Sequence, residues 1–374
     1  AINLFFIEEP EAHTHPQMQY IFIKNIKSLL KENQKREDGL TIHLQSVITT
    51  HSSHIVSECE FDDIKYFHKC PTEKGIVSKN LKSLKKAYSS DDPVTSEKYQ
   101  KAFKFLKQYL TLNRAELFFA DKAIFIEGDT ERILIPAMMK KLDQEEAAES
   151  EVPLISQNIS IVEVGAYSHI FEKFIDFIGI KSLVITDIDS QYKEIDEKVS
   201  KKDGEKDNKK DGEKYITIKC KPNDSKADKT SNSSLKFFYE SDDLEYFKTL
   251  GIDDRALKKA GDKWKKDSEG HLLFVYQTEE NGYHGRSFED AFFSLNKDML
   301  GNDPSMFPSL TQIHFKNFVD NEGADPFQFS NKAVNSKPTL AIEILLNSEE
   351  SEDSDFSNWK IPAYIKEGLL WLRK

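Results

Sequence analysis

Acidic residues follow short apolar stretches at three places in this 374-residue sequence. In AIFIEGDTER, Glu127 ends a predicted strand and Glu131 comes four residues later, in the first turn of a predicted helix. Both carboxylates can then face one point above a sheet. In SLVITDIDS, Asp187 and Asp189 end another predicted strand, and their i, i+2 spacing directs both side chains to one face. Glu289, in GRSFEDAF, adds a carboxylate at the start of a further helix.

Carboxylates gathered in this way predict a site for divalent cations. Each close pair would repel by about 4 kcal/mol at an effective dielectric constant of about 20. Hard oxygen ligands suit Mg²⁺ or Mn²⁺, and the sequence has no paired Cys and His with the spacing of a zinc site. Two such ions about 4 Å apart stabilise both the attacking and the leaving oxygen of a phosphoryl displacement. The pattern therefore predicts a two-metal nuclease.

Other polar residues near these acids have simpler interpretations. Asp129 and Asp290 are expected to be helix N-terminal acids favoured by the helix dipole, although either could be a ligand. Glu163, at the end of a predicted strand, could support the ligands. His169 is expected to pack or to face solvent rather than to act in catalysis.

The N-terminal region has the pattern of a nucleotide hydrolase. FFIEEPEAH is an apolar strand that ends in Glu8 and Glu9, one suited to hold magnesium and the next to act as base. VITTHSSHI is a second apolar strand, suited to lie next to the first, and its His51 can hydrogen-bond a γ-phosphate. The sequence contains no G-x-x-x-x-G-K-[ST] phosphate loop. We expect the chain to be the C-terminal part of a longer protein, with ATPase activity only at full length.

The elements that must position these residues alternate between short apolar strands and amphipathic helices. This alternation predicts an α/β fold over a mainly parallel sheet. A charged loop is expected over 190–214, and another over 349–355. The predicted strands are Ile2–Ile7, Leu44–Thr49, Ala123–Glu127, Ile159–Glu163, Ser182–Thr186 and Leu272–Tyr276, and the predicted helices are Pro16–Lys35, Ser96–Phe119, Thr130–Leu142 and Ser168–Ile178.

The formal charge of -12 argues against a protein that coats nucleic acid non-specifically. One local segment differs, since RALKKAGDKWKK carries six cations against one anion and includes a tryptophan. As a helix it could follow a phosphate backbone and offer a ring for base stacking, or it could simply be a solvated face. The nucleic-acid candidates are Arg255, Lys258, Lys259, Lys263, Trp264, Lys265 and Lys266.

The cysteine content and the hydropathy predict a cytoplasmic protein. Cys59, Cys70 and Cys220 form no pair with metal-ligand spacing and are odd in number, which favours a reducing compartment. No apolar run is long enough to cross a bilayer.

The N-terminal motifs resemble the ATPase domain of the ABC class, in the form found in RecF-like and OLD-family (overcoming lysogenization defect) proteins. The E-G-x-x-E and D-x-D motifs resemble the Toprim domain, a Rossmann-like fold with a mainly parallel sheet. Together they resemble OLD-family nucleases, which include the Gabija nuclease subunit. The implied domains are a C-terminal half of an ABC-type ATPase (residues 1–90), a connecting helix (91–120) and a Toprim nuclease domain (121–374) with a helical insertion at about 231–270 and C-terminal helices.

The resemblance implies a role for each matched residue. Glu8 would be the metal-binding Walker B acid, Glu9 the catalytic base and His51 the switch histidine. In the Toprim part Lys337 would neutralise charge on the scissile phosphate, and Lys332 competes with it for this role. The implied metal ligands are Glu127, Glu131, Asp187, Asp189 and Glu289.

The resemblance also implies a function and partners. It implies a DNA endonuclease or nickase with two Mg²⁺ or Mn²⁺ ions, regulated by an ATPase domain that uses ATP, in anti-phage defence or DNA processing. The implied partners are DNA, a second copy of the chain or a higher homo-oligomer, and a UvrD-like helicase or another defence component, with no membrane. Two alternatives stay open: a non-cleaving Toprim module for dimerisation and DNA sensing, and a topoisomerase-like or primase-like Toprim enzyme.

Overall fold

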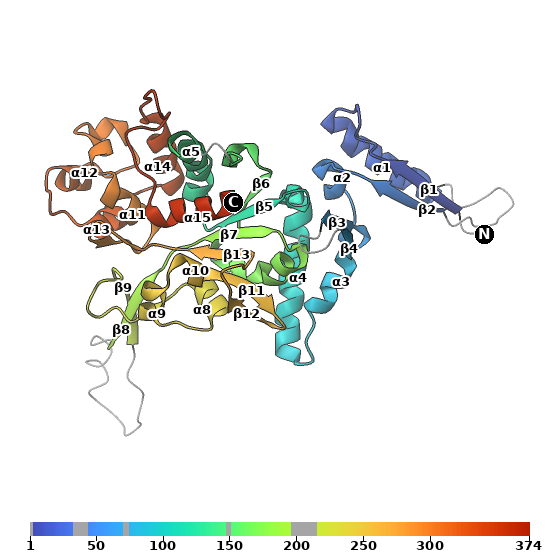
Figure 1. Cartoon of the computed structure of the whole chain (residues 1–374), viewed down its shortest axis with the longest axis horizontal. Coiled ribbons are helices and arrows are strands. Elements are labelled where there is room, and N and C mark those ends of the chain that lie inside the picture. The colour runs from blue at the N-terminus through green and yellow to red at the C-terminus, as the bar shows by residue number, and fades with distance from the viewer. Residues whose placement is uncertain (1–2, 33–43, 70–74, 147–150, 196–214) are drawn as a thin grey trace, which may run out of the picture. The chain divides into compact units, whose positions relative to one another are not determined.

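A computed structural model of the chain describes residues 3–32, 44–69, 75–146, 151–195 and 215–374. The chain forms two compact units (Figure 1), one comprising residues 1–121 and 170–179 and the other residues 122–169 and 180–374. Both contain helices and strands, and the second contains a mainly parallel sheet, so the predicted α/β class is confirmed.

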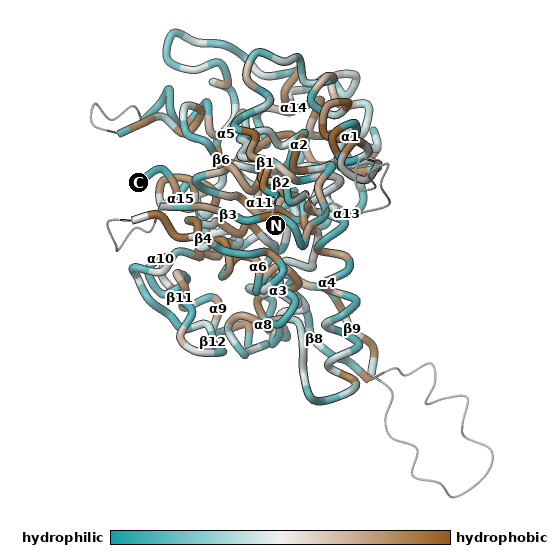
Figure 2. The backbone as a smooth tube through the Cα atoms, turned by 90° about the vertical axis from the view of Figure 1, so that its right-hand side faces the viewer, coloured by the Kyte–Doolittle hydropathy of each residue, from teal (hydrophilic) through white to brown (hydrophobic). Residues whose placement is uncertain are grey.

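Two parallel strands open unit 1. β1 (Asn3–Glu8) pairs with β2 (Leu44–Thr49), with Glu8 opposite Thr49. The prediction that these strands are neighbours in one sheet is therefore confirmed. Phe5 and Phe6 are 47% and 67% exposed, so β1 presents apolar side chains on both faces. The helix α1 (Pro16–Glu32) also has a hydrophobic stretch, coloured brown in Figure 2.

The remaining elements of unit 1 are short except for two helices, α1 and α4. α4 (Pro93–Asn113) begins where Asp92 accepts a hydrogen bond from the Thr95 amide at 2.8 Å and Pro93 occupies the first turn. The predicted helix Ser96–Phe119 is thus α4 followed by a 3₁₀ turn, Ala115–Phe118. The other elements are α1 (Pro16–Glu32), α2 (Ser53–Ser57), β3 (Lys65–Lys69), β4 (Ile76–Asn80), α3 (Leu81–Ala87) and α6 (Glu172–Ile178).

A six-stranded sheet forms the centre of unit 2, in the order β12-β11-β13-β7-β5-β6. The four strands β13, β7, β5 and β6 are parallel, whereas β11 runs antiparallel to both of its neighbours. The parallel strands match the predicted ones within a residue. Their bounds are β5 (Lys122–Ile126), β6 (Ile159–Glu163), β7 (Lys181–Ile185) and β13 (Leu272–Val275), beside β11 (Ala256–Ala260) and β12 (Lys263–Lys266).

The central strands are apolar throughout because both faces of the sheet are covered. Leu273 and Val275 belong to the main core with the helices α5, α11 and α15. Phe274 points the other way and packs on Phe238 of α8, with ring centroids 4.7 Å apart. In Figure 1 α15 lies on one side of β7 and β13, and α8 and α10 lie on the other.

Two lysines hold the C-terminal helix α15 (Ala363–Arg373) on the sheet. The Lys122 ammonium donates to the carbonyls of Leu372 at 2.6 Å and Arg373 at 3.1 Å. The Lys181 ammonium donates to the Trp371 carbonyl at 2.7 Å. These carbonyls have no partner within the helix, so the two cations complete its C-terminus and favour its dipole.

Helices and small strand pairs complete unit 2. A three-stranded sheet has the order β10-β8-β9, and β14 and β15 form a hairpin. Their bounds are β8 (Ser190–Ile195), β9 (Tyr215–Lys219), β10 (Lys229–Thr230), β14 (Glu279–Glu280) and β15 (Tyr283–His284), and the helices are α5 (Asp129–Glu145), α8 (Ser233–Tyr239), α9 (Leu244–Thr249), α10 (Ile252–Arg255), α11 (Phe288–Leu295), α12 (Gln312–Val319), α13 (Pro326–Ala333) and α14 (Lys337–Leu346).

Three sequence predictions were wrong in part. The segment 255–266 is a β-hairpin, β11–β12, instead of a helix, so the helical part of the 231–270 insertion ends at Arg255. Ser190–Ile195 is a strand instead of loop, while residues 196–214 lie outside the described ranges. The predicted helix Ser168–Ile178 is a 3₁₀ stretch, Gly165–Phe171, followed by α6.

Candidate active site

Glu127 follows the last residue of β5 at the carboxyl edge of the parallel sheet. Its Oε1 accepts a hydrogen bond from the Asn232 amide at 2.9 Å and another from the Thr186 hydroxyl. Burial, followed by the negative charge of Asp189, raises the pKa of Glu127 although these hydrogen bonds act against the rise. Glu127 is therefore a half-buried carboxylate in a negatively charged environment.

Glu131 lies in the first turn of α5 and is only 8% exposed. A Cβ at Gly128 would lie 3.3 Å from Glu131 Oε2, so glycine at this turn leaves room for the carboxylate to fold back toward Glu127. Burial and the charge of Glu289 raise the pKa of Glu131 to about 7. The charge of Glu127 also raises the pKa of Glu131, so the two glutamates of E-G-x-x-E lie within electrostatic reach of each other.

Asp187 follows β7 next to the helix α11. Its Oδ1 accepts hydrogen bonds from the Gln277 side chain at 2.6 Å and from the Phe288 amide at 3.0 Å. Burial raises the pKa of Asp187 well above its usual value, and the charges of four neighbouring carboxylates raise it further. These carboxylates are Glu127, Glu131, Glu289 and Asp189.

Asp189 is paired with a buried arginine. Its Oδ1 lies 2.5 Å from Arg286 Nη2, and Arg286 Nε donates to the Ser190 carbonyl at 3.0 Å. Asp189 has φ 50°, in the left-handed region that aspartate tolerates better than most residues. Its backbone carbonyl accepts from the Ser231 amide at 2.9 Å, which fixes this conformation.

Glu289 is 4% exposed and is paired with Lys337. The Lys337 ammonium lies 2.9 Å from each oxygen of the Glu289 carboxylate. Burial by itself would lower the pKa of Lys337, but the charge of Glu289, the hydrogen bond to it and the charges of Asp187 and Glu131 together raise the pKa above its usual value. Lys332 instead donates to Gln328, one turn earlier on α13, at 3.3 Å. Of the two lysines, only Lys337 contacts the acid cluster, by which we mean Glu127, Glu131, Asp187, Asp189 and Glu289.

The acid cluster has a surplus of negative charge. Among the residues that the structure describes, two cationic side chains pair with acids of the cluster, Arg286 with Asp189 and Lys337 with Glu289. If all five carboxylates are ionised, these two cations leave three negative charges unbalanced. Within the described ranges no three His, Cys, Asp or Glu side chains are gathered closely enough to hold a metal ion, so the acids do not form a closed ligand cage. Their number and their oxygen donors nevertheless fit Mg²⁺ or Mn²⁺, whose charge would favour the ionised carboxylates.

The neighbouring acids have structural partners. Asp290 is fully buried, accepts from the Ser287 amide at 2.6 Å and the Arg286 amide at 2.8 Å, and completes the capping box of α11. Asp129 lies 3.0 Å from Arg132 on the same helix, and Arg132 Nε lies 3.5 Å from Glu163. His169 contacts the rings of Tyr167 and Phe237.

Four polar residues that our sequence reasoning did not single out position the acids. They are Thr186, Asn232, Gln277 and Arg286. Asn232 caps α8 through its oxygen, while its amide reaches Glu127 and the Asp187 carbonyl. An asparagine directly before a serine-rich helix start is an N-cap signal. Thr186 follows β7 directly, and Gln277 lies two residues after β13. Arg286 gave no comparable signal.

The proposed ATPase residues of unit 1 lie at the ends of β1 and β2. His51 Nε2 lies 3.4 Å from Glu9 Oε1, and both side chains are largely exposed. Glu9 has φ 39°, and its amide donates to the Thr49 carbonyl at 3.0 Å. Glu11 accepts from the His51 amide at 2.6 Å and from Thr50 Oγ1 at 2.9 Å, so it anchors the loop after β2. Glu8 is the last residue of β1 that pairs with β2, and it lies opposite Thr49.

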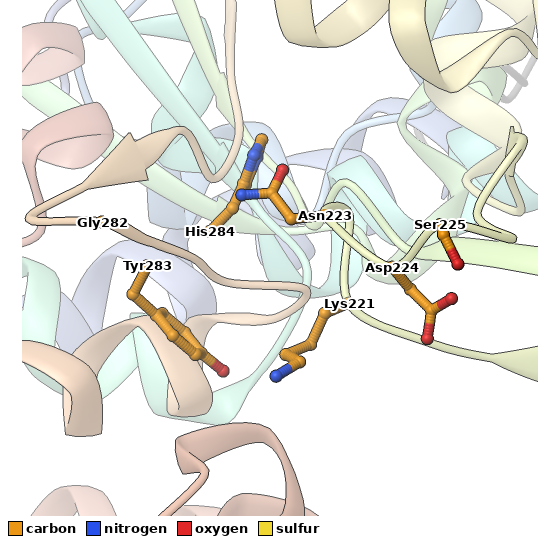
Figure 3. A pocket seen from close by; sticks show the side chains of 7 residues that line it. All are labelled: Lys221, Asn223, Asp224, Ser225, Gly282, Tyr283 and His284. Carbon is orange, nitrogen blue, oxygen red and sulfur yellow. The ribbon is translucent and has the colours of Figure 1, made fainter. Parts of the chain in front are cut away.

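A cavity of about 340 Å³ opens beside β15 (Figure 3). Tyr283 and Lys221 line it, and their side chains point to the same side in this view. Tyr283 donates to Asp290 at 3.0 Å, but Lys221 is paired with Asp325 at 3.1 Å. Because Asp325 already neutralises the Lys221 ammonium, the lining of this cavity does not indicate an anion site.

The basic segment 255–266, which contains the hairpin β11–β12 (the basic hairpin), offers fewer cations for contact with DNA than its sequence predicted. Arg255 is buried, donates to the Leu250 carbonyl at 2.8 Å and lies over the Tyr276 ring, so it is not available to DNA. Lys258, Lys263, Lys265 and Lys266 are exposed, while Lys259 and Trp264 are half-buried. Lys263 is paired with Glu240 at 2.8 Å.

Sequence comparisons match two segments of the chain to two kinds of domain. Residues 1–56 match the model of an AAA ATPase domain, and residues 118–189 match that of the overcoming lysogenization defect protein-like TOPRIM domain. Endonuclease GajA of Bacillus cereus (strain HuB5-5) is 29% identical over the whole chain, and Old nuclease of Escherichia phage P2 is 27% identical over 50% of it. The chain spans 49% of the first relative and 28% of the second.

Solved structures of OLD proteins are also similar. The C-terminal region of the Xanthomonas campestris pv. campestris OLD protein covers 69% of this chain at 18% identity, with a TM-score of 0.36, and 94% of that structure is covered. The C-terminal region of the Burkholderia pseudomallei OLD protein covers 68% at 18% identity, with a TM-score of 0.35, and 98% of that structure is covered. TM-scores below 0.5 do not establish a common fold. In the described residues, no helix combines the length and the apolar character needed to span a bilayer.

Proposed function

Because the chain joins a segment of an AAA-type ATPase domain to an OLD-like Toprim domain, we propose that it is a metal-dependent DNA endonuclease or nickase. The observation that carries the proposal is the acid cluster: five carboxylates near the ends of strands and helices, with two cations of the described ranges in contact. The printed names of two relatives, an endonuclease and a nuclease, support the reaction class.

The proposed mechanism assigns a role to each part of the cluster. Glu127, Glu131, Asp187, Asp189 and Glu289 would hold two Mg²⁺ or Mn²⁺ ions, which when bound stabilise the attacking and leaving oxygens of the phosphodiester. Thr186, Asn232 and Gln277 orient Glu127 and Asp187 through hydrogen bonds. Lys337, half-exposed and next to Glu289, would neutralise charge that develops on the scissile phosphate.

Unit 1 is proposed to regulate cleavage. Glu8, Glu9 and His51 would act on ATP in a complete ATPase domain, with Glu8 on the metal and Glu9 as base. The proposal extends to a homo-oligomer, to a helicase or other defence component as partner, and to a role in anti-phage defence in the cytoplasm. These extensions rest on the resemblance to the OLD family.

A plasmid assay tests the proposal. With Mg²⁺ or Mn²⁺ we expect nicked or linear product, and Asp187→Ala and Glu127→Ala should abolish it while circular dichroism shows an intact fold. Asp129→Asn is the matched control, because this acid lies two residues from Glu127 but pairs with Arg132, so it should leave cleavage unchanged. Wild-type rates in either alanine variant would contradict the site, and a wild type inactive with every metal would favour a DNA-sensing module that does not cut.

A further inference from the structure

The side chain of Gln277 links the acid cluster to the C-terminal helix α15. Gln277 is 1% exposed, and its Oε1 accepts a hydrogen bond from the Ile188 amide at 2.8 Å. Its Nε2 donates to Asp187 Oδ1 at 2.6 Å and to the Tyr364 hydroxyl at 3.2 Å. A side-chain amide has one oxygen and two N–H donors, so these three contacts engage all of its polar groups.

Tyr364 acts as a neutral acceptor in this link. It lies in the first turn of α15 and is 2% exposed. Because the amide nitrogen of Gln277 can only donate, the Tyr364 oxygen must accept this hydrogen bond. Burial raises the pKa of Tyr364 well above its usual value, and the charge of Asp187 adds to the rise. The phenol therefore keeps its proton while its oxygen accepts from Gln277.

The three partners together fix the orientation of the Gln277 amide. If the amide were turned over, its oxygen would face the Asp187 carboxylate and its nitrogen would face the Ile188 N–H, and both contacts would be repulsive. Without the Tyr364 oxygen, one buried N–H of Gln277 would lose its acceptor, which is unfavourable. The Tyr364 hydroxyl thus helps to keep the other N–H directed at Asp187.

The packing of α15 keeps the Tyr364 hydroxyl within reach of Gln277. Gly368 lies one turn after Tyr364 on the same face of the helix. A Cβ at Gly368 would lie only 3.0 Å from a methyl carbon of Leu183 on β7, so glycine lets α15 lie close to the sheet (Figure 1). At the start of the helix, the Ala363 amide donates to Glu280 at 2.9 Å. The helix is therefore held in place on both sides of Tyr364.

We propose that Tyr364 is a positioning residue of the acid cluster, which holds Asp187 in place for metal binding through Gln277. The C-terminal helix is then part of the site, although it carries none of the five acids of the cluster. Residues that hydrogen-bond to metal ligands orient these ligands, and their loss typically weakens metal binding about 10-fold to 100-fold. The inference rests on the proposed nuclease function and adds a positioning residue to it.

The test measures metal binding without cleavage. Isothermal titration calorimetry with the whole chain and Mn²⁺ compares the wild type with Tyr364→Phe, which removes only the hydroxyl. We expect Mn²⁺ binding to weaken about 10-fold, the lower end of the range above, because Tyr364 acts through a second residue. An affinity equal to that of the wild type would overturn the proposal.

Tyr276→Phe is the matched control. Tyr276 is also fully buried, and its hydroxyl donates to the Phe247 carbonyl at 2.9 Å, away from the acid cluster. Loss of this hydrogen bond should lower the melting temperature, as Tyr364→Phe also should, but it should leave Mn²⁺ affinity unchanged. An equal loss of Mn²⁺ affinity in both variants would mean that Tyr364 has a general structural role, and the proposal would be wrong.

Urea denaturation without metal tests whether Tyr364 acts through Gln277. Substitutions that share a partner are not additive, so the shift of the urea midpoint caused by Tyr364→Phe should fall by about half or more when Gln277→Ala is already present. Midpoint shifts that add in full would contradict the link.

These outcomes are distinguishable from failure of the nuclease proposal. If the wild type cuts plasmid with Mg²⁺ but Tyr364→Phe binds Mn²⁺ as tightly as the wild type does, Tyr364 is not a positioning residue and the nuclease stands. If the wild type cuts nothing with any metal, while Tyr364→Phe weakens Mn²⁺ binding and its urea shift depends on Gln277, the positioning role stands and the nuclease fails.

Discussion

Replacement of Lys337 by methionine tests whether this lysine belongs to the acid cluster. The substitution keeps most of the apolar stem and removes the ammonium that lies 2.9 Å from both oxygens of Glu289. Glu289 is 4% exposed, so it would keep a buried charge without its cation. Lys332→Met is the matched control, since Lys332 donates to Gln328 at 3.3 Å and to no acid within the described ranges.

The expected loss of stability follows from this geometry. A hydrogen bond to a charged group contributes about 1.5–3 kcal/mol. The Lys337 side chain is 59% exposed, and solvent screening weakens exposed pairs. We therefore expect Lys337→Met to lower the free energy of unfolding by about 1–2 kcal/mol, and Lys332→Met to change it by less than about 0.5 kcal/mol.

Urea denaturation measures this difference, and a double-mutant cycle with Glu289→Gln isolates the pair. Once Glu289 is neutral, the further loss from Lys337→Met should fall by about 1 kcal/mol. Plasmid cleavage should slow by about 10²-fold to 10³-fold in Lys337→Met, because a positioned charge at the scissile phosphate is lost, and should be unchanged in Lys332→Met. Equal effects of the two substitutions, or a larger effect at Lys332, would refute the assignment.

Three further perturbations follow from the same structure. Saturating Mg²⁺ should stabilise the wild type, by about 2.7 kcal/mol at 100 times its Kd, as measured by thermal melting; an equal gain in Asp187→Asn would argue against a cation held by the acid cluster. Lys122→Met should cost about 2 kcal/mol in urea denaturation, because three acceptors of the Lys122 ammonium, on Gln157, Leu372 and Arg373, lose their donor; an unchanged midpoint would show that these contacts do not hold α15. Burial and the nearby charge of Lys122 lower the pKa of Lys181 to about 8. Since its folded pKa lies below the unfolded value of 10.5, the unfolded chain binds more protons between pH 8 and pH 10.5, and stability contributed by Lys181 rises over that window. The stability difference between wild type and Lys181→Met should therefore increase from pH 7 to pH 10, and a decrease would contradict the shift.

Local sequence predicted the central strands well because burial on both faces of a parallel sheet requires continuous apolar runs. β2 and β6 have the predicted bounds, and Glu127 and Asp187 lie within two residues of the ends of β5 and β7. Asp189 was predicted to end the same strand as Asp187, but it lies in the loop between β7 and β8 with φ 50°. The turn between Glu127 and Glu131 is likewise a local feature, since a Cβ at Gly128 would lie 3.3 Å from the Glu131 carboxylate; a common metal site for the two glutamates stays a prediction.

The basic hairpin shows why local propensity failed elsewhere. Lysine and alanine favour helices, yet residues 256–260 and 263–266 pair as strands because β11 extends the sheet next to β13. The two-residue loop Gly261-Asp262, with Gly261 at φ 65°, carried the contrary signal. Sheet pairing depends on a strand that is close only after folding, so the segment alone could not decide its state.

The sequence by itself determined which side chains could bind cations and which strands would carry them, because residue type and spacing fix both. Only the tertiary structure decided their partners. Arg286 pairs with Asp189 and Lys337 with Glu289 across long sequence separations. Such contacts depend on how helices and strands pack, and no local pattern records that packing.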